Sequence, residues 1–191
     1  MANTRGERTQ IIIALLKKTY PDAHIVLKYK TPWELLVSVI LSAQCTDVMV
    51  NKVTEKLFAK YKTIEDYGRA DLAEFEQDIK STGFYRNKAK NILAAVALIH
   101  EKFGGRVPRT MVELQGLPGV ARKTANVVLG NAYGVVDGIA VDTHVLRLSQ
   151  RLQLVDLVKI GGKKELVFQR PSLGGHQRPG LDRIDYKKDA D

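Results

Sequence analysis

The stretch Leu-Gln-Gly-Leu-Pro-Gly-Val-Ala-Arg-Lys-Thr-Ala, residues 114–125, constrains the fold more than any other part of the chain. It predicts a tight turn between two helices, because Pro118 fixes one backbone angle and Gly119 can adopt a positive φ without a Cβ clash. The following helix, expected over residues 121–133, begins with backbone N–H groups that lack an intrahelical acceptor. With the helix dipole and the charge of Arg122, these groups suit a DNA phosphate, a contact that gives affinity but reads no base.

The charge balance of the chain favours a polyanionic partner. Lys and Arg number 30 against 21 Asp and Glu, which gives a net charge of +9. Such a balance favours nucleic acid, while an ordinary basic surface and binding to anionic lipid remain alternatives. No secretory h-region and no apolar run of roughly 20 residues is present, so no membrane partner is expected. One cysteine excludes an internal disulfide and fits a reducing compartment, so we expect a cytoplasmic protein. Binding to DNA would make it nucleoid-associated, and we expect it to be a monomer.

Apolar periodicity and helix-start residues predict an all-α fold with about nine helices before residue 155. Thr31, Pro32 and Glu34 favour a helix start with a capping box, and the apolar run after them predicts a buried central helix. The inward-facing sets expected on four other helices are Ile11, Ile12, Leu15 and Leu16; Val48, Val50, Val53 and Leu57; Ile92, Val96 and Ile99; and Val145, Leu148 and Leu152. Asn87 is expected to open the long helix that ends at Gly104. Residues 166–168 form a strand candidate without an obvious partner, and little fixed structure is expected beyond Pro171.

Four motifs in order carry a resemblance to a known family. They are Leu-Ser-Ala-Gln-Cys-Thr-Asp at 41–47, Gly-Phe-Tyr-Arg-Asn-Lys-Ala at 83–89, the hairpin at 114–125, and Val-Asp-Thr-His at 141–144. In this combination the chain resembles the endonuclease III family of DNA glycosylases over about residues 7–156. The resemblance implies a helix-hairpin-helix DNA glycosylase fold, with a six-helix barrel-like domain and a second helical lobe that is incomplete here. We expect an N-terminal helix of the second lobe at 1–25, the glycosylase domain at 26–155 with its hairpin at about 110–133, and a Gly/Pro-rich basic tail at 156–191.

The same resemblance implies that Lys123 and Asp142 are catalytic. A neutral lysine amine can attack the sugar C1′ and hold it as an imine. A carboxylate stabilises the positive charge that develops on the sugar. From the residues alone, Lys123 would be a phosphate-binding lysine and Asp142 a plain N-cap of the next helix. Both roles of Asp142 are compatible, since a cap position is rigid.

Further residues are implied to bind DNA. A base inside the duplex must be extruded, and the resemblance makes Gln44 and Phe84 the side chains that fill the vacated space. Phe84 is otherwise a core aromatic at a helix end, and the family usually has a smaller apolar residue there. Asp47 is a first-turn acid that also lines the pocket by resemblance, and Lys88 is either a phosphate contact or solvated. The full predicted DNA-binding set is Gln44, Phe84, Leu117, Gly119, Val120, Ala121, Arg122 and His144.

The chain departs from the family at two places. Most relatives carry four cysteines near the C-terminus that bind a [4Fe–4S] cluster, and Cys45 alone cannot supply them, so no cofactor or metal is expected. We interpret this as a truncation or a disturbed 3′ coding region, with a natural cluster-free form as the alternative. Ala121 stands where many relatives have glycine, which costs about 1 kcal/mol if φ is positive there and nothing if it is negative.

The predicted function follows from the lysine. Relatives that bear it are bifunctional: they remove a base and then nick the strand 3′ to the abasic site by β-elimination. We expect this activity on double-stranded DNA that contains damaged bases, oxidised pyrimidines by family analogy, or abasic sites. A non-catalytic helix-hairpin-helix DNA-binding module and a mismatch-specific or monofunctional glycosylase are the alternatives.

Overall fold

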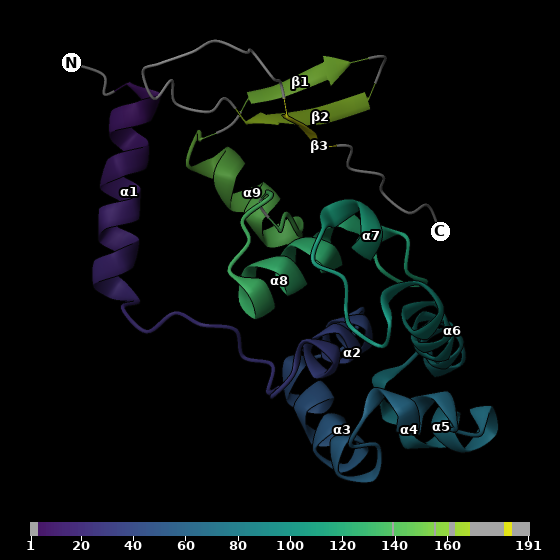
Figure 1. The fold of residues 1–191 in the computed structure, drawn as a ribbon. Helices are drawn as coiled ribbons and strands as arrows, with labels where there is room; N and C mark the ends of the chain where they lie inside the picture. The colour runs from purple at the N-terminus through teal and green to yellow at the C-terminus, as the bar shows by residue number, and fades with distance from the viewer. Residues whose placement is uncertain (1–3, 139, 155, 161–162, 169–181, 185–191) are drawn as a thin grey trace. The chain divides into compact units, whose positions relative to one another are not determined.

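The fold divides into two compact units, shown in Figure 1. A computed structural model describes residues 4–138, 140–154, 156–160, 163–168 and 182–184. One unit spans residues 24–140, and the other combines residues 1–23 with residues 141–191. The predicted domain boundaries after residues 25 and 155 stay a prediction. None of the helices formed by the described residues has the length and apolar content that a membrane span requires.

The unit of residues 24–140 is helical throughout its described part. Its elements in chain order are α2 (Pro32–Ser42), α3 (Asp47–Lys60), α4 (Ile64–Gly68), α5 (Leu72–Asp78), the 3-10 helix η1 (Lys80–Thr82), α6 (Tyr85–Phe103), α7 (Met111–Gln115) and α8 (Arg122–Tyr133). As predicted, α2 is buried on nearly all sides, and it packs against α3, α6 and α8. This central helix therefore fixes where the loop after it, residues 43–46, meets the start of α8.

Helix starts follow the sequence closely. Seven of the nine α-helices in the described part of the chain begin at a Thr or Asp whose side chain accepts a backbone N–H bond. The other two, α6 and α8, begin at Phe84 and Ala121 with no side-chain cap. The capping box expected at Thr31 is half formed: Thr31 accepts from the Glu34 N–H, but the Glu34 carboxylate accepts from the N–H of Lys30.

Two details of the helical pattern were wrong. Val48 belongs to the stripe predicted for α3 but is 79% exposed, whereas Val50, Val53 and Leu57 are buried as expected. Val48 lies one position after the first residue of α3, where the helix faces solvent. The long helix begins at Tyr85 rather than Asn87, because Phe84 adopts a left-handed conformation and serves as the N-cap.

The second unit contains α1 (Arg5–Thr19), α9 (Thr143–Arg151) and three strands: β1 (Asp156–Ile160), β2 (Lys163–Phe168) and β3 (Asp182–Ile184). The strands form an antiparallel sheet in the order β1-β2-β3, with Val158 opposite Glu165 and Val167 opposite Arg183. The predicted strand at 166–168 therefore has partners on both sides. The expectation of little fixed structure beyond Pro171 falls largely on residues outside the described ranges.

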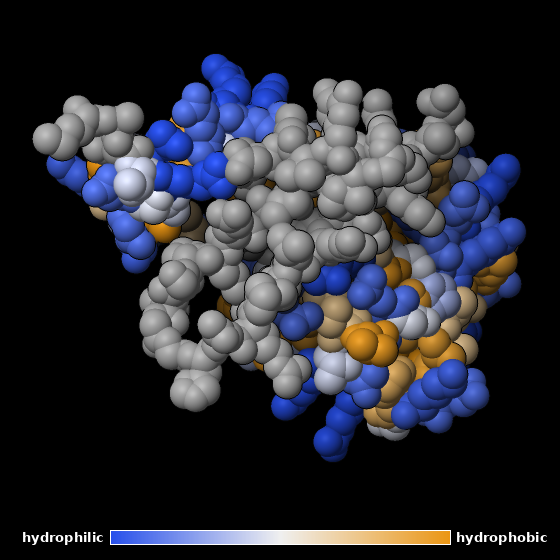
Figure 2. Space-filling model, turned by 90° about the horizontal axis from the view of Figure 1, so that it is seen from above, coloured by the Kyte–Doolittle hydropathy of each residue, from blue (hydrophilic) through white to orange (hydrophobic). Residues whose placement is uncertain are grey.

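Apolar cover in this second unit is sparse. No residue of α1 is buried, and Ile11, Leu15 and Leu16 are each about half exposed. On α9 the predicted inward positions Leu148 and Leu152 are 49% and 39% exposed, and Ser149 is the buried residue instead. In Figure 2 the described surface on the face shown is mainly hydrophilic, with hydrophobic side chains gathered in patches. A surface of this kind accords with a net charge of +9.

Candidate active site

The hairpin at residues 111–133 has the geometry that its sequence predicts. Gly119 has φ of +76°, and the turn closes with the Val120 N–H donating to the Leu117 carbonyl at 3.2 Å. Leu117 and Val120 are almost fully buried, so the DNA contacts predicted for them are restricted to their backbone groups. Ala121 has φ of −82°, so the alanine at this position costs no backbone strain.

Gly119 is also required for close packing. A Cβ built at this position would lie 2.9 Å from the Cβ of Asn91 on α6, closer than carbon atoms normally approach. The glycine therefore serves both the turn and the seating of the hairpin on α6. Gly130, in the middle of α8, has open space around its would-be Cβ.

This difference gives a matched pair of substitutions. Gly119→Ala should lower the free energy of unfolding by more than the roughly 1–2 kcal/mol of left-handed strain, because the clash with Asn91 adds to it. Gly130→Ala should raise it by about 0.5–1 kcal/mol, since alanine favours a helix interior. Urea unfolding followed by circular dichroism measures both. Equal effects of the two alanines would contradict the role assigned to Gly119.

The start of α8 is electropositive and open to solvent. Seven other helices of the described part have a Thr or Asp side chain that accepts a first-turn N–H bond. Ala121 has no such group, so α8 begins without a side-chain cap. Arg122 and Lys123 are both exposed in that first turn. A helix start without a side-chain cap, a helix dipole and two basic residues at one place are the elements of a phosphate site.

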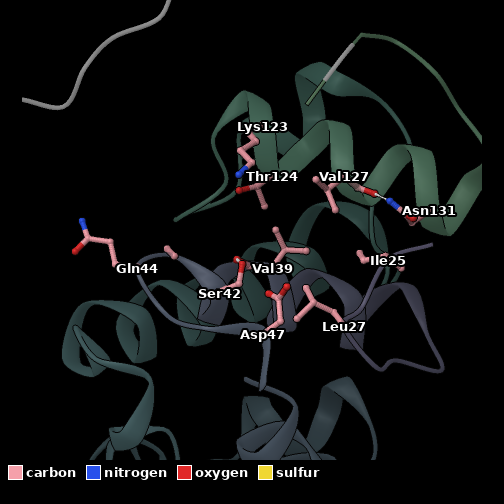
Figure 3. Close-up of a pocket in the computed structure, with 11 residues that line it drawn as sticks. Ile25, Leu27, Val39, Ser42, Gln44, Asp47, Lys123, Thr124, Val127 and Asn131 are labelled. Atoms are coloured by element: carbon pink, nitrogen blue, oxygen red, sulfur yellow. Dashed lines mark hydrogen bonds between the residues drawn. The ribbon is translucent and has the colours of Figure 1, made fainter. Parts of the chain in front are cut away.

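A pocket of about 560 Å³ opens beside this helix start (Figure 3). Its lining comes from the segment before α2, from α2 and the loop after it, and from α3 and α8: Ile25, Leu27, Val39, Ser42, Ala43, Gln44, Asp47, Lys123, Thr124, Val127 and Asn131. In Figure 3 Lys123 and Thr124 extend from α8, and the oxygen atoms of Ser42 and Asp47 point toward them from the opposite wall. The volume and the mixture of apolar side chains with a few polar groups are typical of a ligand site.

The pocket brings together residues that lie far apart in the sequence. Gln44, Asp47 and Lys123 were singled out from the sequence, and all three line it. Ser42 and Thr124 were not, although both lie inside the motifs at 41–47 and 114–125. The position of Asn131 in the pocket was also missed. Its side chain donates to the Val127 carbonyl at 2.8 Å, and no sequence pattern predicts this hydrogen bond.

Gln44 and Phe84 share an unusual backbone. Their φ angles are +53° and +46°, and Gln153 is the remaining non-glycine residue with positive φ in the described ranges. Both side chains are exposed, and the large apolar ring of Phe84 is 65% exposed. The alternative of a core aromatic for Phe84 is therefore wrong. Exposed side chains on strained backbone are features that concentrate at functional sites.

Asp142 lies in the other unit, where it caps α9. Its Oδ1 accepts from the N–H groups of His144 and Val145 at 3.0 and 2.9 Å, so the cap role is present. His144 is exposed in the first turn of that helix. The catalytic pairing of Asp142 with Lys123 and the DNA contact of His144 stay predictions.

The residues of this chain do not fit an iron–sulfur cluster. A [4Fe–4S] cluster is held by four thiolates, and the sequence has one cysteine. That residue, Cys45, is partly buried against the hydrophobic core after α2. Within the described ranges no group of three or more His, Cys, Asp and Glu residues is placed to hold a metal ion. We therefore assign no chemical step to a cluster or a metal.

Known proteins with similar sequences come from one superfamily of DNA repair proteins. Residues 37–166 match the HhH-GPD superfamily of base excision DNA repair proteins. Endonuclease III of Synechocystis is 56% identical over 154 residues, which cover 81% of this chain and 70% of the relative. Endonuclease III of Bacillus subtilis is 58% identical over 133 residues, 70% of this chain and 60% of the relative. The chain thus spans about 60–70% of the length of these relatives.

Solved structures agree with the sequence comparison. A non-covalent endonuclease III–DNA complex matches with a TM-score of 0.75 and 52% identity, covering 80% of this chain and 70% of that one. A thermostable thymine-DNA glycosylase matches with a TM-score of 0.70 and 25% identity over 77% of this chain and 69% of that one. The fold is that of a helix-hairpin-helix DNA glycosylase, which confirms the predicted fold class. The chain belongs to the HhH-GPD superfamily and, within it, to the endonuclease III family of base-excision DNA glycosylases and lyases.

Proposed function

We propose that this protein removes damaged pyrimidines from double-stranded DNA and then nicks the strand at the resulting abasic site, with Lys123 as the nucleophile. The observation that carries the proposal is the position of Lys123 in a pocket of about 560 Å³, at the uncapped start of α8. The pocket is large enough for one extruded nucleoside. The adjacent helix start can hold a phosphate of the same strand.

The chemistry divides into two steps that share one intermediate. The Lys123 amine forms a bond to the sugar C1′ while the bond from C1′ to the base breaks, and the base leaves with the bonding electrons and gains a proton. The sugar ring opens to an imine, which acidifies the C2′ proton. Removal of that proton breaks the C3′–O bond and releases the 3′ phosphate, and water then frees the lysine.

The other pocket residues would support these steps by position, and Asp142 would contribute its charge. The carboxylate of Asp142 would stabilise positive charge on the sugar and assist proton transfer, as the family resemblance implies. Asp47, Ser42 and Thr124 present oxygen atoms to the pocket and suit the polar edge of a damaged base. The apolar lining residues Ile25, Leu27, Val39 and Val127 suit its ring face.

Extrusion of the base needs side chains that take its place. Gln44 stands at the edge of the pocket, where its amide can hydrogen-bond the orphaned opposite base. Phe84 presents an exposed ring that can enter the base stack. The protein would act as a monomer where cellular DNA is found, which agrees with the predicted cytoplasmic, nucleoid-associated location.

The test is covalent trapping. The protein should be incubated with a duplex that contains one abasic site, and borohydride should reduce the imine to a stable adduct visible on a denaturing gel. Without borohydride, the same duplex should be nicked 3′ to the site. A duplex with an oxidised pyrimidine should give both products, and an undamaged duplex neither.

The results separate the alternatives. DNA binding without adduct or nick would favour a non-catalytic binding module. Release of the base from a damaged duplex without strand cleavage would favour a monofunctional glycosylase, and release of a normal base from a mismatch would favour a mismatch-specific enzyme. Any of these three results would overturn the proposed bifunctional activity.

A further inference from the structure

Lys88 is a charged residue buried inside the unit of residues 24–140. It is 5% exposed, and it is the buried lysine among the described residues, where lysine is rarely found without a reason. Its place in the first turn of α6 and the basic character of the chain favour a phosphate contact or a solvated side chain. The structure contradicts both, because the ammonium group points inward.

Two backbone carbonyl groups receive the Lys88 ammonium. Its Nζ donates to the carbonyl oxygen of Leu41 and to that of Thr82, each at 2.8 Å. Leu41 lies near the C-terminal end of α2, three residues before Gln44. Thr82 ends η1, two residues before Phe84. One side chain thus connects the helix ends that precede two loops, which are about 40 residues apart in the sequence.

Each of these loops, residues 43–46 (the Gln44 loop) and residues 83–84 (the Phe84 loop), carries an exposed side chain on left-handed backbone. Gln44 and Phe84 have φ of +53° and +46°, a conformation that is unfavourable for residues with a Cβ atom. Such a conformation persists only where the surrounding structure holds it. The hydrogen bonds from Lys88 hold the two helix ends from which these loops start.

Burial has a measurable cost for this residue. Desolvation lowers the pKa of Lys88, because the charged form loses its hydration in the interior. A methionine of similar length would fill the same space without a charge to bury, yet it could donate to neither carbonyl. Core packing alone therefore does not account for a lysine here.

We propose that Lys88 is a positioning residue that holds the Gln44 loop and the Phe84 loop at a fixed separation, so that both side chains enter the duplex together at a lesion. This inference rests on the proposed function, in which Gln44 and Phe84 fill the space left by an extruded base. Lys88 touches neither the DNA nor the reacting atoms in this account. It acts by fixing the geometry of the two residues that do.

The test compares two duplexes of the same sequence, one undamaged and one with a tetrahydrofuran residue, an abasic-site analogue that the protein cannot cleave. The ratio of the two dissociation constants measures how much binding depends on entry into the lesion. For Lys88→Met this ratio should fall by about 10-fold to 100-fold, because misplacement by about 1 Å has effects of that size. Binding to the undamaged duplex, which depends on backbone contacts, should stay within about threefold.

A double-mutant cycle separates positioning from loss of stability. Phe84→Ala should lower the same ratio, and adding it to Lys88→Met should cause little further loss, because the second change removes a side chain already misplaced. Independent, multiplicative losses would overturn the proposal. Lys88→Arg, which keeps cationic donors, should retain more of the ratio than Lys88→Met; equal losses in the two variants would also overturn it.

Lys60→Met provides the matched control. Lys60 lies in the same unit and bonds Asp78 and Glu74, so its loss lowers stability without touching either loop. It should leave the ratio unchanged, and a fall equal to that of Lys88→Met would reduce Lys88 to a stability residue. If Lys88→Met does not fold by circular dichroism, Lys88→Leu, which also has no donor, replaces it with the same expectations. Wild-type protein that does not distinguish the two duplexes would overturn the proposed function itself, whereas intact discrimination in folded Lys88→Met would overturn only this inference.

Discussion

Lys123→Ala should abolish the covalent adduct with an abasic duplex and lower strand nicking by at least about 10,000-fold. The reason is chemical: alanine has no amine, so neither the imine nor the β-elimination that depends on it can form. The fold should be unaffected, because residue 123 is exposed in the first turn of α8. Borohydride trapping and gel analysis of the nicked strand measure the two losses.

The control for this variant is another exposed lysine. Lys56 lies on α3 and is exposed. Lys56→Ala removes the same charge from the same unit, so it should trap DNA as wild type does. Normal trapping by Lys123→Ala would refute the assignment of the nucleophile, and equal losses in both variants would point to net charge rather than chemistry.

Asp142→Asn should lower base release by about 100-fold to 1,000-fold while leaving stability nearly unchanged. Asparagine retains an oxygen that can accept the N–H bonds of His144 and Val145, so the cap of α9 survives. What it removes is the negative charge that would stabilise the developing sugar cation. Single-turnover release of an oxidised pyrimidine, with urea unfolding alongside, measures both quantities.

Asp142→Ala distinguishes the two roles of this residue. It removes both charge and cap, so it should cost about 0.5–2 kcal/mol of stability in addition to the loss of activity. Should Asp142→Asn retain full activity, Asp142 would be a structural cap alone. The nucleophile would then have a different electrostatic partner, and Asp47 in the pocket would be the next residue to replace.

Local signals in the sequence predicted helix positions well, because they act over a few residues. Thr31 and Asp142 are predicted as helix caps, and both side chains accept a backbone N–H bond. Gly119 was expected at positive φ and has it. The start of α6 was misplaced because Phe84, a residue with no capping group, takes the N-cap position in a left-handed conformation.

Features that depend on distant contacts were not predictable in the same way. The charge of Lys88 suggested a surface position, and only the meeting of α6 with the ends of α2 and η1 shows why it is buried. Val48 matched an apolar stripe, yet only packing decides which side of the first turn of α3 faces the core. The pocket likewise required tertiary structure, although Gln44, Asp47 and Lys123 could be selected individually by resemblance.

Helix α6 holds several parts of the proposed DNA-binding surface in fixed positions, which affects how the protein would find a lesion. Its N-cap is Phe84, its first turn carries Lys88, and its Asn91 packs against the hairpin glycine Gly119. Residues held by one helix keep fixed positions relative to one another, so we expect the DNA rather than the protein to deform when the two bind. A duplex yields most easily where pairing or stacking is already weak. If Gln44 and Phe84 enter the DNA duplex as proposed, their fixed positions would let the protein distinguish weakly paired lesion sites from intact DNA before any bond is broken.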